Sequence, residues 1–126
     1  MSDCKCNSKE TVAVFACSCG ADVGEIADLA ARKLSQAEGR HMFSCSSIAG
    51  KVDGLIKKAE AADTILAIDG CGVDCVKKCL AECGFTDVKH FQLGEIDMKK
   101  TKTPVTDQAV DAAVAKGECV LKGCCS

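Results

Sequence analysis

The chain has 126 residues, of which 48% are hydrophobic and 27% are charged. This balance is typical of globular proteins, and the length suits one domain whose hydrophobic core forms without disulfides. The formal net charge is −2, charges of both signs are interspersed, and aromatic residues make up only 3%. The sequence therefore has neither the basic face nor the stacking aromatic residues that are typical of nucleic-acid-binding proteins.

The first half of the chain predicts two strands that alternate with two helices. Thr11–Ala16 is a short run of β-branched and apolar residues, which is typical of a buried strand. Asp22 is the expected N-cap of a helix that continues to about Glu38. Arg40–Cys45 predicts a second strand, and Lys51–Ala61 predicts a second helix with its apolar residues on one face.

The second half repeats this alternation. Thr64–Ile68 is the clearest strand in the sequence, and Val73–Cys83 predicts a helix that ends before a glycine. Asp87–Leu93 alternates like a strand. After a polar connector, Pro104 is expected in the first turn of a last helix. Glu118–Leu121 predicts a final short edge strand.

Strands and helices that alternate at short intervals imply βαβ units with right-handed crossovers. We therefore expect the α/β fold class, with a single three-layer domain, a mostly parallel four- to five-stranded sheet and helices on both faces. This domain, which we expect to bind a metal, is predicted over residues 11–121. Two tails that contain cysteine, residues 1–10 and 122–126, are expected to be mobile.

Cysteine is far more frequent than in ordinary globular proteins. The twelve cysteines are Cys4, Cys6, Cys17, Cys19, Cys45, Cys71, Cys75, Cys79, Cys83, Cys119, Cys124 and Cys125. In a short secreted chain this number would indicate a disulfide scaffold. However, residues 1–10 are polar and do not resemble a signal peptide, and the apolar runs fall far short of the ~20 residues of a membrane span. We therefore expect a cytoplasmic protein that binds no membrane, in which clustered thiols are typical of metal ligands or redox groups.

The positions of five cysteines favour a metal site. Cys17 and Cys19 follow the first predicted strand, Cys45 follows the second, Cys71 follows the third, and Cys75 lies one helical turn further on. Binding sites in open parallel sheets form at the carboxyl ends of the strands, so these thiols are expected to share one site. Helix N-termini at this edge favour the thiolate form, and thiolates are the ligands of zinc and other soft metals.

Several of these residues also fit a family pattern. The chain resembles the DGC-domain family, which is named for an Asp-Gly-Cys motif, from about Thr11 to Asp107. The matching segments are Cys17-Ser18, Gly24-Glu25, Cys45, Ala49-Gly50, Ile68-Asp69-Gly70-Cys71 and Cys75. The resemblance implies a small prokaryotic cytoplasmic protein that binds zinc through four cysteines, which by motif position are Cys17, Cys45, Cys71 and Cys75. It implies no enzymatic activity. Cys19 stands outside the usual pattern and adds a fifth candidate ligand.

Two alternatives to a zinc site stay open. The pairs Cys17/Cys19 and Cys71/Cys75 also suit a thiol oxidoreductase or a sulfur carrier, in which one thiolate attacks and the other resolves. An iron–sulfur cluster is a further alternative, because its iron is also held by thiolates.

The sequence also predicts roles for two further cysteines, one aspartate and two histidines. Cys79 and Cys83 lie at helical spacing with Val76 and Leu80, so we expect them to pack in the core. Asp69 is expected either to cap the helix that follows it or to orient a thiolate. His41 opens its strand and is expected at the edge opposite the cysteines, and His90 is expected to be a partly exposed residue of the sheet.

Overall fold

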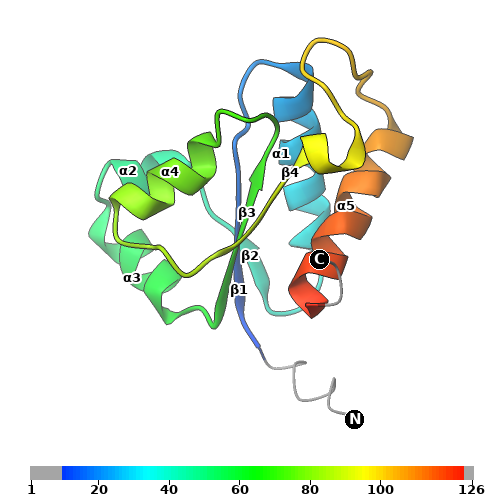
Figure 1. The fold of residues 1–126 in the computed structure, drawn as a ribbon. Coiled ribbons are helices and arrows are strands. Elements are labelled where there is room, and N and C mark those ends of the chain that lie inside the picture. The colour runs from blue at the N-terminus through cyan, green and yellow to red at the C-terminus, as the bar shows by residue number, and fades with distance from the viewer. Residues whose placement is uncertain (1–9, 124–126) are drawn as a thin grey trace.

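Strand β1 (Val12–Ala16) is buried at all five positions, because helices cover both faces of the sheet to which it belongs. The computed structural model describes residues 10–123, so the predicted tails lie outside it except for Glu10, Lys122 and Gly123. The sheet has four parallel strands in the order β2-β1-β3-β4 (Figure 1), and the other three are β2 (Arg40–Met42), β3 (Thr64–Asp69) and β4 (Lys89–Gln92).

The helices form the two outer layers (Figure 1). On one face lie α1 (Asp22–Leu34) and α5 (Asp107–Lys122), and on the other lie α2 (Cys45–Ala49), α3 (Asp53–Ala61) and α4 (Cys75–Glu82). A short 3-10 helix, η2 (Leu93–Ile96), follows β4. Alternate residues of β1 point to opposite faces: Val14 packs among α1 and α5, whereas Phe15 packs against the helices of the other face. The predicted three-layer α/β domain is confirmed, with a sheet that is parallel throughout.

The predicted edge strand at Glu118–Leu121 is wrong, because α5 continues through these residues to Lys122. Val110, Ala113 and Gly117 are its buried residues, at helical spacing. A Cβ on Gly117 would lie 2.7 Å from Cδ1 of Leu34, so glycine lets α5 pack closely on α1. The next residue, Glu118, accepts two hydrogen bonds from the guanidinium of Arg40 in β2, at 2.8 and 2.9 Å. These contacts hold the segment as helix.

The predicted strand Arg40–Cys45 is too long, since β2 ends at Met42 and Cys45 already begins α2. The cause is local capping: the hydroxyl of Ser44 accepts a hydrogen bond from the Ser47 amide at 3.3 Å and starts the helix. A helix of five residues is too short to show an apolar period.

The predicted bounds of five other elements shift. Asp22 is the first residue of α1 and not its N-cap, and α1 ends at Leu34, before a turn, and not near Glu38. Pro104 precedes α5, whose N-cap is Thr106, so the proline is not in the first turn. The helix expected from Val73 begins at Cys75. The helix expected from Lys51 begins at Asp53, and the strand expected over 87–93 covers Lys89–Gln92. None of the helices in the described part of the chain is long and apolar enough to cross a membrane.

Candidate metal centre

The carboxyl ends of β1 and β3 lie side by side, with Ala16 paired to Ile68 in the sheet. From this point the chain leaves β1 toward α1 on one face and leaves β3 toward α4 on the other face (Figure 1). Open α/β sheets bind ligands at the carboxyl edge where the chain diverges in this way. The two loops at this point contain Cys17 and Cys19 after β1, and Gly70 and Cys71 after β3.

Cys17 is held at the centre of this edge by backbone groups. Its amide donates to the carbonyl of Ile68 at 3.1 Å. Its sulfur accepts hydrogen bonds from the backbone amides of Gly70 and Cys19. Burial nevertheless raises the pKa of the Cys17 thiol, since it outweighs these hydrogen bonds, and repulsion from Cys19 and Asp69 adds to the effect. Amide donors of this kind are the usual outer-shell partners of a metal-bound thiolate.

Two glycines allow the loops to approach α1 closely. A Cβ on Gly70 would lie 2.9 Å from the backbone carbon and oxygen of Val23 in α1. A Cβ on Gly24 would lie 2.5 Å from the sulfur of Cys19 and 2.7 Å from its backbone nitrogen and oxygen. Larger residues at either position would push apart the loops that carry the cysteines.

Three of the predicted ligands line one cavity of about 240 Å³. Cys17 follows β1, Cys45 is the first residue of α2, and Cys75 is the first residue of α4, so three separate elements contribute a thiol. The remaining lining residues are Ser46, Ala49, Val76 and Cys79. The Cys45 thiol donates to the carbonyl of Ala16 at 3.8 Å, which ties α2 to the end of β1.

The other two predicted ligands lie outside the lining of this cavity. Cys19 is exposed and sits against Gly24, and Cys71 is half-buried and packs against the core cluster on the α1 and α5 face. None of the described cysteines forms a disulfide. Over residues 10–123, no three cysteine sulfurs lie within 4.8 Å of one another, so an ion held by three of them would need these sulfurs to lie closer together.

The expectation that helix N-termini favour thiolates here is wrong for Cys45. Burial raises the pKa of Cys45 to about 12, and repulsion from the neighbouring Cys79 and Asp69 adds to this. The α2 dipole does not compensate, because a helix of five residues is short and the thiol is largely removed from water.

The Cys45 thiol of the metal-free protein is therefore expected to react with iodoacetamide about 30-fold more slowly than a cysteine in a peptide at neutral pH. A pKa raised from 9.0 to about 12 reduces the thiolate fraction about 1,000-fold, and the greater nucleophilicity of a more basic thiolate recovers only part of that loss. Mass spectrometry of timed samples measures the rate. In urea, Cys45 should react like the peptide, and an equally fast reaction in the folded protein would contradict the prediction.

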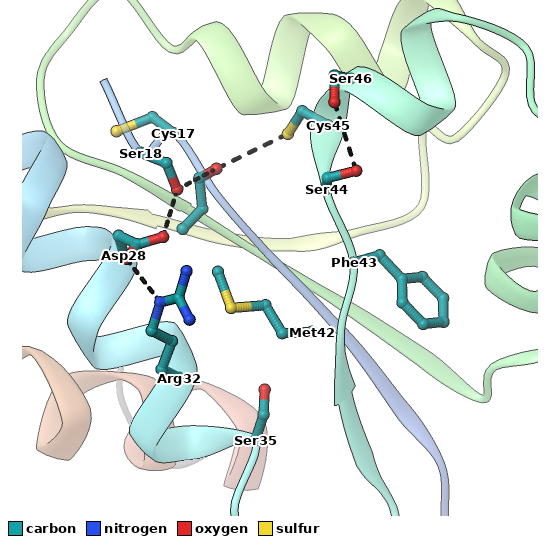
Figure 2. Close-up of a pocket in the computed structure, with 11 residues that line it drawn as sticks. Cys17, Ser18, Asp28, Arg32, Ser35, Met42, Phe43, Ser44, Cys45 and Ser46 are labelled. Atoms are coloured by element: carbon teal, nitrogen blue, oxygen red, sulfur yellow. Dashed lines mark hydrogen bonds and ion pairs between the residues drawn. The ribbon is translucent and has the colours of Figure 1, made fainter. Parts of the chain in front are cut away.

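A wider cavity of about 760 Å³ lies between α1 and β2 and shares Cys17 and Cys45 with the first. Figure 2 shows Asp28 and Arg32 on its α1 wall, with the Cys45 sulfur directed toward the Ala16 carbonyl. Asp28 accepts hydrogen bonds from the Ser18 hydroxyl and the Arg32 guanidinium, both at 2.8 Å. The thiols are thus accessible from the α1 side of the sheet.

Asp69, a buried carboxylate, holds the start of α4 beside the thiols. Its two oxygens accept hydrogen bonds from the amides of Val76 and Lys77 at 2.8 and 3.2 Å. Asp69 thus caps the helix in place of Asp74, the N-cap residue, whose side chain makes no capping hydrogen bond. Of the two roles predicted for Asp69, the structure shows this capping role. Its Oδ2 also lies 2.9 Å from Nε2 of His90.

Sequence reasoning missed the grouping of Asp69, Asp74 and His90, whose ligand atoms all lie within 4.8 Å of one another. His90 was expected only as a partly exposed sheet residue. The available signal was the strand alternation: Phe91 is buried toward α1, so His90 points to the opposite face, where Asp69 also points. His41 pairs with Ala13 near the start of β1, away from the cysteines, as expected.

A family model described as DGC domain matches residues 13–116. The chain belongs to the DGC-domain family. This confirms the resemblance seen in the sequence.

The DGC domain is also similar to the anaerobic and virulence modulator AnvM of Pseudomonas aeruginosa, with 36% identity over 87 residues. The similar segment covers 69% of this chain and 66% of that protein, slightly less than two thirds of its length. No solved structure matches the chain. Membership of the DGC family and the number of cysteines support a metal-binding role.

Proposed function

We propose that this DGC domain binds a soft metal ion, Zn²⁺ in the first instance, through cysteine thiolates at the carboxyl edge of its sheet. The observation that carries the proposal is the single cavity lined by Cys17, Cys45 and Cys75, which lie far apart in the sequence. Cys71 and Cys19, which border the same edge, complete the candidate set. The role is structural or concerned with metal handling, and the compartment is a reducing cytoplasm in which ligand thiols stay reduced.

The chemistry of these residues fits a soft cation. The donors are sulfur atoms, which zinc binds as thiolates, and the amides of Gly70 and Cys19 already donate to the Cys17 sulfur. In the free protein the raised pKa values of Cys17 and Cys45 reflect burial, with repulsion from neighbouring thiols and from Asp69 adding to it. When bound, a divalent cation supplies the positive charge that makes several adjacent thiolates stable.

Elemental analysis of anaerobically purified protein, followed by zinc reconstitution of the metal-free form, tests the proposal. We expect each of the changes Cys17→Ser, Cys45→Ser and Cys75→Ser to lower zinc affinity by about 100-fold or more, because even loss of an outer-shell partner costs 10–100-fold. Cys119→Ser is the control, since Cys119 lies in α5 on the other face of the sheet. Protein without metal and with freely titrating thiols would exclude the proposal, and a brown protein with visible absorbance would indicate an iron–sulfur cluster instead.

Zinc affinity is expected to rise with pH across the neutral range. The pKa values of Cys17 and Cys45 are raised, so both thiols are protonated near neutral pH and must release a proton to bind metal. The gain approaches about tenfold per pH unit for each thiol deprotonated on binding. Competition titrations with a chelator between pH 6.5 and 8, corrected for protonation of the chelator, measure the slope. An affinity independent of pH would show that these thiols do not coordinate the metal.

The alternative of a thiol oxidoreductase or sulfur carrier is less well supported. A pKa raised by burial makes Cys17 a poor attacking thiol at neutral pH, so the pair Cys17/Cys19 lacks a ready nucleophile. Rapid alkylation of one cysteine at neutral pH, at a rate that chelators do not change, would favour this alternative. The same test applies to the pair Cys71/Cys75.

A further inference from the structure

Cys75 and Cys79 in α4 and Cys83, the C-cap residue of this helix, follow one another at intervals of four residues, but their surroundings differ. Cys83 packs against the core cluster on this side of the sheet, and its thiol donates to the carbonyl of Ile48 at 3.5 Å. This agrees with the core role predicted for it. Cys79 is not among the side chains that pack against this cluster, and it lines the 240 Å³ cavity instead.

The contacts of Cys79 bind it to a candidate ligand. Its thiol donates to the backbone carbonyl of Cys45 at 3.7 Å. Both side chains also line the same cavity. Because α2 and α4 pack together, Cys45 and Cys79 are held side by side from two helices.

The cavity has the donor set of a thiolate metal site. Four sulfurs line it, those of Cys17, Cys45, Cys75 and Cys79, and its other lining residues carry no carboxylate or imidazole. Four sulfur donors around one space are the ligand set of closed tetrahedral zinc sites. Cys71, which the family resemblance includes among the ligands, lies outside the lining.

From this arrangement we infer that Cys79 is a metal ligand, which together with Cys17, Cys45 and Cys75 forms a four-thiolate site for one soft divalent cation. This inference rests on the proposed function and deepens it, because it names a ligand on the second turn of α4 that the family pattern does not contain. The matched control is Cys83, which lies four residues further along the chain, at the C-cap of the same helix.

The experiment compares Cys79→Ser with Cys83→Ser in the full chain, using Zn²⁺ for affinity and Co²⁺ as a spectroscopic probe. We expect Cys79→Ser to lower zinc affinity by about 100-fold or more and to weaken the sulfur-to-cobalt charge-transfer band, whereas Cys83→Ser changes affinity less than about threefold. Adding Cys71→Ser shows whether Cys71 or Cys79 supplies the fourth sulfur. Thermal unfolding of the metal-free variants shows whether each remains folded.

The outcomes separate the two proposals. Wild-type protein that binds no metal overturns the proposed function itself. Wild-type protein that binds metal, with Cys79→Ser binding as well as Cys83→Ser does, overturns only the role of Cys79. If Cys79→Ser does not fold, alkylation of the wild-type protein decides: bound Zn²⁺ must slow the reaction of Cys79 much more than that of Cys83. Equal protection of the two thiols, or none, overturns the inference.

Discussion

Replacement of Gly70 by alanine is expected to lower the free energy of unfolding by about 3 kcal/mol, which is the upper range for steric overpacking. The new Cβ would lie 2.9 Å from the backbone carbon, the carbonyl oxygen and Cγ2 of Val23. Val23 cannot easily yield, because the adjacent Asp22 carboxylate accepts the amides of Thr101 and Thr103 at 2.9 and 3.0 Å. Urea unfolding of the metal-free protein measures the change.

Gly72→Ala is the control for this prediction. A Cβ at Gly72 would meet nothing closer than Oε1 of Gln92 at 4.0 Å, so the change should stay within about 1 kcal/mol of the original protein. Equal stability of the two variants would show that Gly70 is not required for close packing. We also expect Gly70→Ala to weaken zinc binding, because the clash of the new Cβ with Val23 would displace the backbone amide that donates to the sulfur of Cys17.

The change Asp69→Asn is expected to cost about 2 kcal/mol of stability, although it is nearly isosteric. The buried carboxylate accepts the amides of Val76 and Lys77 with different oxygens, and an amide side chain offers only one acceptor. The NH₂ group of asparagine would face one of these backbone amides, which is also a donor. The hydrogen bond between the charged carboxylate and that amide at the N-terminus of α4 would be lost. Denaturant unfolding again measures the effect.

Asp74→Asn is the matched control, since Asp74 lies in the same acidic group and makes no cap bond. Its φ of 58° is one that asparagine also tolerates, and its Oδ1 accepts a hydrogen bond from Gln92 at 2.8 Å, which an amide oxygen can replace. The expected loss is below about 1 kcal/mol. A larger loss for Asp74→Asn than for Asp69→Asn would contradict the capping role of Asp69.

The sequence predicts the sheet well because burial leaves a strong local pattern. The five residues of β1 are apolar and buried, so Thr11–Ala16 is recognisable without any knowledge of its neighbours. The same holds for β3. Where a segment is short, the pattern fails: Glu118–Leu121 fits a strand or a helix equally, and only Leu34 and Arg40, distant in sequence, favour the helix.

The sequence predicts where the candidate site lies but not which cysteines line it. Parallel strands deliver Cys17 and Cys71 to the same edge, which the alternation of elements already indicates. Periodicity does not distinguish Cys79 from Cys83, since both lie on the inner face of α4. The difference arises from α2, which places Cys45 beside Cys79 and Ile48 beside Cys83. A helix begun by a single serine cap carries too weak a signal to reveal that contact in advance.

The ion pair between Arg40 and Glu118 bears on how the molecule assembles during synthesis. Its partners are 78 positions apart, and Arg40 starts the strand at one border of the sheet. During synthesis on the ribosome, β2 emerges early, but Glu118, the partner of Arg40, emerges only with the last helix. A long-range closing step of this kind delays completion of the fold until most of the polypeptide exists. Until then the apolar surface that α5 covers in the finished fold stays exposed, and such surface is prone to aggregation.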